Sequence, residues 1–247
     1  LIFLNEQRVP HDLLFAGKEG CGNLPAALAF AQHLFCTSKN EAGACGECSS
    51  CGKVSKLIHP DLHLVFPIAK SKDVKSSDNL IREFREIVLQ NPYLTLNDWF
   101  NELNVENKQP IIPVEEANDI LRKLSYTSYE GSYKMMVIWQ PEKMNTEAAN
   151  KLLKILEEPP EKTIFILVSN NPEKLLSTIL SRVQQIPFYN NSEEEITAAL
   201  IEQFNVNLDV AKQTAMLANG SYSEAISLLS QNEESVSFLN TFQTFMR

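Results

Sequence analysis

The sequence predicts an α/β protein, with a parallel sheet between two layers of helices, followed by a small all-helical domain. Two apolar runs, Met135 to Trp139 and Thr163 to Ser169, have the continuous hydrophobic character of strands that are buried on both faces. Amphipathic helical segments alternate with these runs, and such alternation indicates a three-layer architecture. From Asn190 onward the pattern is helical throughout.

Composition excludes several classes of protein. The chain has 247 residues, of which 44% are hydrophobic and 21% charged, close to the average for globular domains. No apolar run reaches the 18 or so residues of a membrane span. The net charge of −9 comes from 31 acidic and 22 basic residues, so the surface as a whole should repel nucleic acid. We therefore expect any contact with DNA to be shared with partner proteins.

The two ends of the sequence support expectations about location and completeness. The N-terminal LIFLNEQRVPHDLLF has charged and polar residues where a secretory signal needs an unbroken apolar segment, and no initiator Met is present. We expect a cytoplasmic protein whose first residues are missing. At the other end Phe238, Phe242 and Phe245 recur at helical spacing, which predicts the start of a longer helical region that has been truncated.

A glycine-rich turn connects the first apolar strand candidate to an Ala-rich helix, in the order of a phosphate-binding loop. The motif G-x-x-x-x-G-K-[ST] uses backbone N–H groups, a Lys and a hydroxyl to hold phosphates and Mg²⁺. Here Gly17 and Gly22 occupy the glycine positions, with Gly20 between them, but Asn23 replaces the Lys and Leu24 the hydroxyl. Productive Mg-nucleotide binding is not expected. An ordinary tight turn between strand and helix is an equal alternative on the loop alone.

Four cysteines predict a metal site. Cys36, Cys45, Cys48 and Cys51 are separated by eight, two and two residues, and two tandem C-x2-C pairs suit a tetrahedral Cys₄ zinc site. Four thiolate ligands fill the coordination shell, so we expect a structural role. An iron–sulfur cluster remains open, whereas disulfides are disfavoured in a cytoplasmic protein.

Three further residues near these motifs are assigned simpler roles. His59 and His63 follow the cysteines closely, but four thiolates leave them no need to bind metal, so surface or capping roles are expected. Cys21 is expected to be a small buried thiol beside the glycine-rich loop.

The elements in the middle of the chain follow from hydrophobic periodicity. DLHLVFPI alternates like a strand, SKDVKSSDN is typical of a mobile surface loop, and residues 78–106 have helical patterning with aromatic residues at Tyr93, Trp99 and Phe100. We expect this helical stretch to be an insertion without chemistry of its own. From Val114 an amphipathic helix begins, with one face predicted to hold Ala117, Ile120, Leu121 and Leu124.

Prolines and capping residues predict the later boundaries. Pro159 and Pro160 end a helix at Glu158, and Pro172 begins a further short helix. In the helical region Ser192 and Glu195 form a capping box, and Asn219-Gly220 ends a second helix before SEAISLLS, which gives three helices.

Two positions bear on nucleotide chemistry. In a nucleotide hydrolase the strand after such a helix ends in Asp-Glu, which helps to hold Mg²⁺ and orients the attacking water. This chain has Trp139 and Gln140 there, and neither can act in that way. Arg182, in the ILSR segment, could reach the phosphate of a neighbouring molecule from a loop, although taken alone it is more simply a surface or salt-bridged Arg.

The motifs resemble, in order, those of bacterial clamp-loader subunits of the AAA+ class, above all the delta-prime family of DNA polymerase III. The resembling pieces are RVPHDLLFAG, the altered loop, C-x8-C-x2-C-x2-C followed by HPDLH, NKLLKILEEPPEKTIFILVSNNPEKLLSTILSR, and LANGSYSEA. They extend from about Arg8 to Ala225, with an interruption at about 70–110.

The resemblance implies a RecA-like core with a zinc module, a helical lid and a C-terminal collar. In this sequence the core would be 1–189, with the zinc module at about 36–59 and the insertion at about 70–110. The lid would be 190–231, and 232–247 would begin the truncated collar.

The resemblance also implies a function and its residues. It implies a stator that does not hydrolyse ATP, in a loader with gamma/tau ATPase subunits and a delta subunit that places the sliding clamp on primed DNA. Ser181 and Arg182 match the family's SRC element, with Val183 in place of Cys, and Arg182 would be an arginine finger offered in trans. Asn170 matches a sensor position, and the lid's sensor Arg near Ser223 and Glu224 is missing. No productively bound ATP is implied.

Two other functions remain possible from sequence. One is an active clamp-loader ATPase with an unorthodox nucleotide site, because the loop's N–H groups could persist. The other is a zinc-dependent DNA-binding module, which the acidic balance disfavours.

Overall fold

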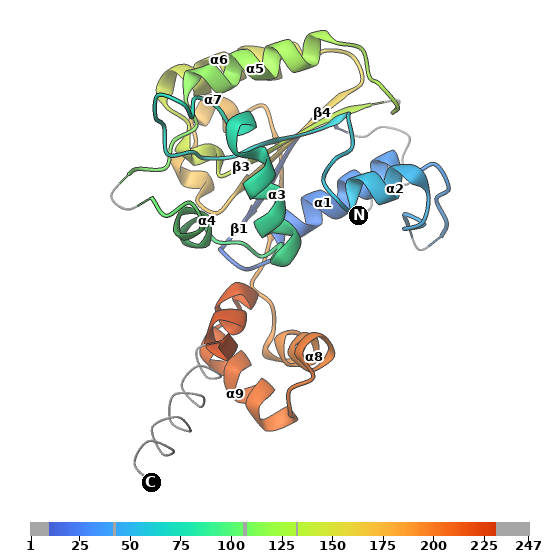
Figure 1. The fold of residues 1–247 in the computed structure, drawn as a ribbon, viewed down its shortest axis with the longest axis vertical. Helices are drawn as coiled ribbons and strands as arrows, with labels where there is room; N and C mark the ends of the chain where they lie inside the picture. Colours follow the sequence, from blue (N-terminus) through green and yellow to red (C-terminus); the bar gives the residue numbers. More distant parts are fainter. Residues whose placement is uncertain (1–9, 42, 106–107, 132, 231–247) are drawn as a thin grey trace. The chain divides into compact units, whose positions relative to one another are not determined.

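The chain forms two compact units in the computed structural model, which describes residues 10–41, 43–105, 108–131 and 133–230. The first unit holds the chain up to Gly17 together with Asn23–Phe188, and the second holds Lys18–Gly22 together with the chain from Tyr189 (Figure 1). The expected start of a collar at 232–247 lies outside the described residues.

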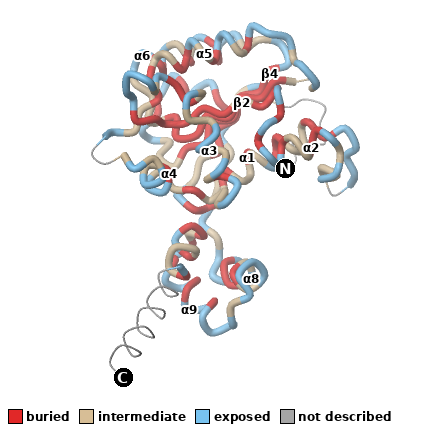
Figure 2. The backbone as a smooth tube through the Cα atoms, in the orientation of Figure 1, coloured by how far each residue is buried: buried red, intermediate tan, exposed pale blue. Residues whose placement is uncertain are grey.

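A five-stranded parallel sheet is the centre of the first unit. Its strands are β1 (Asp12–Gly17), β2 (Leu62–Val65), β3 (Lys134–Trp139), β4 (Thr163–Ser169) and β5 (Gln184–Phe188). Their order across the sheet is β2-β3-β4-β1-β5, and every pair is parallel. All residues of β3 and β4 are buried, as the continuous apolar runs predict for strands covered on both faces (Figure 2).

One face of the sheet is covered by the first four helices. These are α1 (Asn23–Phe35), α2 (Ser49–Val54), α3 (Ile81–Gln90) and α4 (Leu96–Glu102). Phe30 of α1, Phe84 of α3 and Trp99 of α4 join the same core cluster as Val137 and Ile166 of the strands.

The opposite face is covered by the helices of the second half of this unit. These are α5 (Val114–Ser125), α6 (Thr146–Glu157) and the short α7 (Ser177–Leu180). Ile120, Leu152 and Ile179 pack with the alternate strand residues Met136 and Leu167. The two faces therefore have separate cores, which is the expected three-layer architecture (Figure 1).

In the described part of the first unit there are also three single-turn 3-10 helices: η2 (Ser77–Leu80), η3 (Pro141–Lys143) and η4 (Pro172–Lys174). The short helix expected from Pro172 is thus a 3-10 turn, followed after two residues by α7. The loop expected over SKDVKSSDN is only partly a surface loop, because Ser76 and Ser77 are buried and Ser77 begins η2. Ser77 donates from both its N–H and its hydroxyl to Glu116 of α5, at 2.6 and 2.7 Å.

The structure corrects two expectations about these elements. The edge strand β5 was not recognised from sequence, because its alternating residues are mostly exposed and it contains a Pro. Leu121 was expected on the buried face of α5, but its side chain is 48% exposed, whereas Ala117, Ile120 and Leu124 are buried as expected. Consecutive residues of a helix point in directions about 100° apart, so the face that buries Ile120 leaves Leu121 toward solvent.

The described part of the stretch 78–106, residues 78–105, forms the expected helices but belongs to the main core. The rings of Phe66 and Phe84 stack with centroids 3.8 Å apart, and Trp99 meets both edge-on. Trp99 is fully buried and donates its indole N–H to the carbonyl of Pro67 at 2.8 Å. This stretch therefore completes one face of the fold.

The second unit is a group of helices. It contains α8 (Glu193–Phe204), α9 (Leu208–Ala218) and helical residues 222–230. The capping box of Ser192 and Glu195 is present, and Asn219 ends α9 in the left-handed conformation at φ 48°. Among the residues that the structure describes, none of the helices is both long enough and apolar enough to cross a membrane.

Candidate functional sites

The altered phosphate-loop motif begins at the carboxyl end of β1, where strand ends of the sheet meet. The register pairs Ala16 with Ser169 and Val168 with Trp139, so β1, β4 and β3 end side by side. Ligands of open parallel sheets bind at this edge. The geometry therefore places Gly17 and Asn23, the two ends of the motif's loop, where nucleotide chemistry would be expected.

Asn23, which stands where the motif has Lys, turns toward the end of β4. It is the first residue of α1, and its side chain is only 5% exposed. Its amide Nδ2 donates to the carbonyl of Ser169 at 3.3 Å and to Oδ1 of Asn170 at 3.0 Å. Its Oδ1 accepts from the backbone N–H of Leu24, itself 3% exposed. Asn23 and Leu24 are thus engaged in the fold.

Glu142, which sequence reasoning did not single out, secures the same strand end. It lies in η3, after Gln140 has turned the chain through the left-handed region at φ 58°. Its carboxylate accepts from the Ser169 hydroxyl at 2.9 Å and from the N–H groups of Asn170 and Asn171, both at 3.1 Å. A single Glu in a polar turn carries no sequence signal for this role.

The residues at the end of β3 are buried and carry no carboxylate. Trp139 is 2% and Gln140 3% exposed. Trp139 lies in the core cluster beneath α3, with its ring 5.6 Å from that of Phe84. This strand end therefore supplies packing, and its neighbour Glu142 is occupied by three hydrogen bonds.

The middle of the glycine-rich loop belongs to the second unit. The Gly20 carbonyl accepts from the N–H of Tyr222 at 3.0 Å and from Asn191 Nδ2 at 3.3 Å. A Cβ at Gly20 would lie 2.2 Å from the Ser221 hydroxyl, and φ is 80°, so Gly is required here. The segment 221–223 therefore packs directly on the loop. Cys21 is buried, as expected.

Arg182 lies between α7 and β5, and its side chain is 36% exposed. The guanidinium donates to Glu157 at the end of α6 at 2.6 Å and to the carbonyl of Thr178 at 3.0 Å. Exposed ion pairs of this kind contribute about 1 kcal/mol or less. The pair therefore holds the Arg in place with a contact that a stronger anion could replace.

The four predicted cysteines meet at one point. The sulfur atoms of Cys36, Cys45, Cys48 and Cys51 all lie within 4.8 Å of one another, and Cys36 Sγ is 3.6 Å from Cys45 Sγ. A Zn–S bond of about 2.3 Å places tetrahedral thiolates about 3.8 Å apart, so the cluster has the size of a metal site. The donor set fits a metal ion that prefers thiolates.

Backbone N–H groups point at these sulfur atoms and favour their ionised form. Cys45, Cys48 and Cys51 each donate an N–H to the preceding cysteine sulfur, at 3.3 to 3.4 Å. Hydrogen bonds, first from the Thr37 side chain and then from the Cys51 N–H, lower the pKa of Cys48 to about 5. Burial raises the pKa of Cys51 to about 12. A bound cation would offset the repulsion that keeps all four from ionising together.

The HPDLH segment fixes the neighbouring loop and corrects one expectation. Of the two roles expected for His59, the surface position is wrong, because the residue is 2% exposed and its ring stacks on that of Phe35 with the centroids 4.1 Å apart. Its Nδ1 accepts from the N–H of Asp61, a local capping contact. His63 lies in β2, and burial lowers its pKa to about 4. Neither histidine belongs to the metal-competent cluster found in the described residues.

Asp61 holds a loop by three backbone contacts. Its carboxylate accepts N–H groups from Tyr129, Glu130 and Gly131 at 2.6, 2.8 and 2.7 Å. Glu130 also pairs with Lys53 of α2. The start of β2, the loop before β3 and the helix of the cysteine segment are thereby joined. The motif was recognised from sequence, but this role was not.

The fold and the sites together define a RecA-like α/β protein with a helical C-terminal region and a four-cysteine cluster. A mutant RuvB from Thermotoga maritima has the same fold at a TM-score of 0.50 and 13% identity, covering 96% of this chain and 59% of that one. At this identity the likeness concerns the fold alone.

The family is shown by sequence. Residues 3–192 match the model of the family "DNA polymerase III, delta subunit", and the chain belongs to that family. DNA polymerase III subunit delta' of Bacillus subtilis (strain 168) is 33% identical over 94% of this chain and 57% of its own length. DNA polymerase III subunit tau of the same organism is 27% identical over 92% of this chain and 34% of its own length. The delta-prime resemblance is confirmed, and the chain spans little more than half of that relative.

Proposed function

We propose that this chain is the non-hydrolysing delta-prime subunit of a DNA polymerase III clamp loader, the complex that loads the sliding clamp onto primed DNA. One observation carries the proposal: Asn23, at the position of the catalytic Lys, is buried and hydrogen-bonded to Ser169 and Asn170. A neutral amide engaged in this way supplies no cation for a β- or γ-phosphate. Nucleotide chemistry in cis therefore lacks its main electrostatic group.

The surroundings of Asn23 support the same conclusion. Leu24 offers no hydroxyl for Mg²⁺, and the end of β3 offers Trp139 and Gln140 in place of two acids. Glu142 is the carboxylate that follows this strand most closely, and it accepts three hydrogen bonds from the end of β4. Recruiting Glu142 for a metal would break these contacts. A stator role, in which this region is rigid and binds no nucleotide productively, fits the arrangement.

The partners follow from the family. We propose gamma/tau ATPase subunits and a delta subunit as direct partners in a cytoplasmic complex, with the sliding clamp and primed DNA reached through it. The net charge of −9 agrees with a subunit that does not hold DNA on its own. The domain boundaries proposed for this role are 1–189 for the core, 190–231 for the lid and 232–247 for the start of the collar.

Arg182 is proposed as an arginine finger in trans. Its planar, always charged guanidinium suits an anionic phosphoryl group, and the pair with Glu157 leaves the Arg182 side chain 36% exposed. If Arg182 left Glu157 to contact a γ-phosphate bound to the adjacent ATPase subunit, the loss of the ion pair would cost about 1 kcal/mol or less of free energy. Fingers of this kind contribute roughly 10³ to 10⁵ in rate.

The test uses the full-length protein reconstituted with its ATPase and delta subunits, clamp and primed DNA. Arg182→Ala should silence the adjoining ATPase site, so that total turnover falls by the whole share of that site. Arg122→Ala is the matched control, because Arg122 is exposed on α5 and ion-paired with Asp119 at 2.9 Å. Sedimentation must show that the native chain and both variants assemble into the complex to the same extent. Unchanged turnover would leave Arg182 as a surface residue and remove the finger from the proposal.

A second measurement separates the stator from an active ATPase. The purified protein alone should neither bind labelled ATP tightly nor hydrolyse it with Mg²⁺. Hydrolysis that is abolished by Gly22→Ala would show an unorthodox nucleotide site and refute the stator role.

The four-cysteine cluster is proposed to hold one structural zinc ion. The sulfur separations and the N–H groups directed at Cys36, Cys45 and Cys48 support a closed tetrathiolate site. Elemental analysis of untagged protein should give about one zinc per chain. Iron with a visible absorption band would indicate a cluster instead, and the absence of both metals would refute the site.

A further inference from the structure

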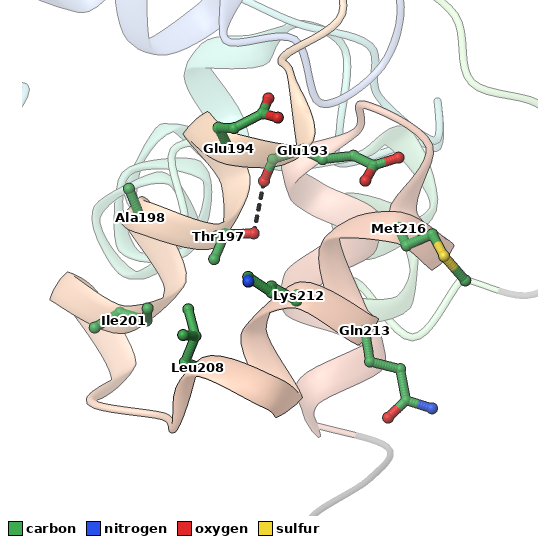
Figure 3. A pocket seen from close by; sticks show the side chains of 9 residues that line it. All are labelled: Glu193, Glu194, Thr197, Ala198, Ile201, Leu208, Lys212, Gln213 and Met216. Carbon is green, nitrogen blue, oxygen red and sulfur yellow. Dashed lines mark hydrogen bonds between the residues drawn. The ribbon is translucent and has the colours of Figure 1, made fainter.

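The second unit contains a groove along the seam between α8 and α9, with a volume of about 630 Å³ (Figure 3). Ala198 and Ile201 line it from α8, and Leu208 and Met216 from α9. Ala198 and Ile201 are three residues apart, and Leu208 and Met216 are eight residues, or about two turns, apart. Both spacings place the two side chains on one face of their helix. The volume lies within the range of about 300–1,000 Å³ typical of binding pockets and has room for several side chains.

The apolar residues of this groove are open to solvent. Met216 is 62% and Leu208 51% exposed, and Ile201 is half-buried. Single exposed apolar residues are common, but here they are aligned along one concave seam. Leu217, next to Met216, is 57% exposed but lies outside the groove, so exposure alone does not define the feature.

Charge around the groove selects the kind of partner. Residues 189–230 contain six carboxylates and one lysine, a net charge of −5. Glu193 and Glu194 lie at one end of the groove, and Lys212 points into the space between the helices (Figure 3). A nucleic acid or another phosphate-rich ligand would be repelled. An apolar segment that carries basic side chains would be attracted.

We propose that this groove binds an amphipathic basic helix of a partner protein. Apolar side chains of that helix, three or four positions apart, would lie on Ala198, Ile201, Leu208 and Met216, and its Lys or Arg residues would meet Glu193 and Glu194. This surface lies in the helical unit and uses none of the residues assigned to nucleotide chemistry, so it goes beyond the proposed function. Its test does not depend on ATP turnover or clamp loading.

Fluorescence anisotropy with the full-length protein tests the proposal. The probe is a labelled peptide of about 18 residues, long enough to form helix, with Leu on one face and Lys beside it. Binding should be saturable, and it should weaken with added salt because the charged contacts are exposed. A peptide of the same composition in scrambled order, which cannot present an apolar face, should bind at least about tenfold more weakly.

Matched variants locate the binding site. Met216→Asp should weaken binding by about tenfold or more, because a carboxylate would be buried against the Leu face. Leu217→Asp, on the adjacent and equally exposed residue, should leave affinity within about twofold. Glu194→Gln should weaken binding by about two- to fivefold and reduce its salt dependence, whereas the exposed Glu202→Gln of the same helix should not.

The proposal is overturned if the scrambled peptide binds as tightly, or if Met216→Asp and Leu217→Asp have the same effect. It is also overturned if the full-length protein does not bind the peptide. Self-association that Met216→Asp abolishes, measured by sedimentation, would identify a second copy of the chain as the occupant instead. Arg182→Ala should not change peptide binding, so failure here and failure of the proposed function are separable.

Discussion

Replacement of Asp61 by Asn should destabilise the first unit and loosen the loop before β3. The native carboxylate accepts three backbone N–H groups, one through Oδ1 from Tyr129 and two through Oδ2 from Glu130 and Gly131. An amide has one acceptor oxygen. Whichever way the Asn side chain is turned, its NH₂ group faces at least one of these N–H donors.

The magnitude follows from this count. A hydrogen bond to a charged group contributes about 1.5–3 kcal/mol, and a donor left without an acceptor adds its desolvation cost. Loss of one bond and weakening of the others by loss of charge gives a destabilisation of about 2–4 kcal/mol. Asp61 is 3% exposed, so solvent does not replace the lost acceptor readily.

The pH dependence provides an independent signature. Burial raises the pKa of Asp61, but the three N–H donors from Tyr129, Gly131 and Glu130 outweigh it, so the folded pKa is lowered. A depressed folded pKa gives stability that is present above the unfolded pKa of about 3.9 and is lost as pH falls below it. The native protein should therefore lose stability in acid more steeply than Asp61→Asn.

Urea unfolding at several pH values and amide hydrogen exchange provide the measurements. The N–H groups of Tyr129, Glu130 and Gly131 should exchange faster in Asp61→Asn, while those of β4 change only with global stability. Asp73→Asn is the control, because Asp73 is exposed, and it should change stability by about 0.5 kcal/mol or less. A change below that value in Asp61→Asn, with the three N–H groups still protected, would refute the reasoning.

Three further predictions concern other sites. Asp12→Asn should stabilise the protein at pH 7.5 by about 1 kcal/mol, because burial, partly offset by His11, raises the pKa of Asp12 to about 6, and the partial exposure of the group limits the effect. The native carboxyl destabilises the fold only when it is ionised: this penalty is absent below the unfolded pKa and grows as pH rises through the folded value, so urea unfolding at pH 4 should show no gain for Asp12→Asn. Cys48→Ser should abolish stoichiometric zinc and make residues 36–52 the first site of limited proteolysis, and retention of one zinc per chain would contradict the assigned ligand set. Restoring the phosphate-loop residues as Asn23→Lys with Leu24→Thr should not produce ATP hydrolysis in a phosphate-release assay, because Gln140 still stands where the acids are needed, and measurable turnover would refute this account.

Local periodicity predicted most of the fold correctly. Strands β3 and β4 are buried on both faces, so their residues form continuous apolar runs that are visible without knowledge of any neighbour. The end of α6 just before Pro159 and the capping box at Ser192 were also predicted, because their causes lie within a few residues. Strand β5 was missed because pairing with β1 defines it, and its own side chains are mostly exposed.

The sites likewise separate into features with local causes and features that depend on distant parts of the chain. The cysteine spacing predicted a cluster that the structure forms, because short loops force nearby ligands together. The roles of Glu142 and Asp61 could not be predicted, since each depends on backbone N–H groups from another part of the chain. The burial of His59 could not be predicted for the same reason, since it depends on stacking with Phe35.

The sequence by itself determined the class of fold, the cysteine cluster and the family to which the chain belongs. These features depend on residue type and spacing over short stretches. Only the tertiary structure decided that Asn23 bonds to the end of β4, that Arg182 pairs with Glu157, and that a groove opens between α8 and α9. Such contacts join segments distant in sequence or depend on how two helices pack, and no local pattern records that geometry.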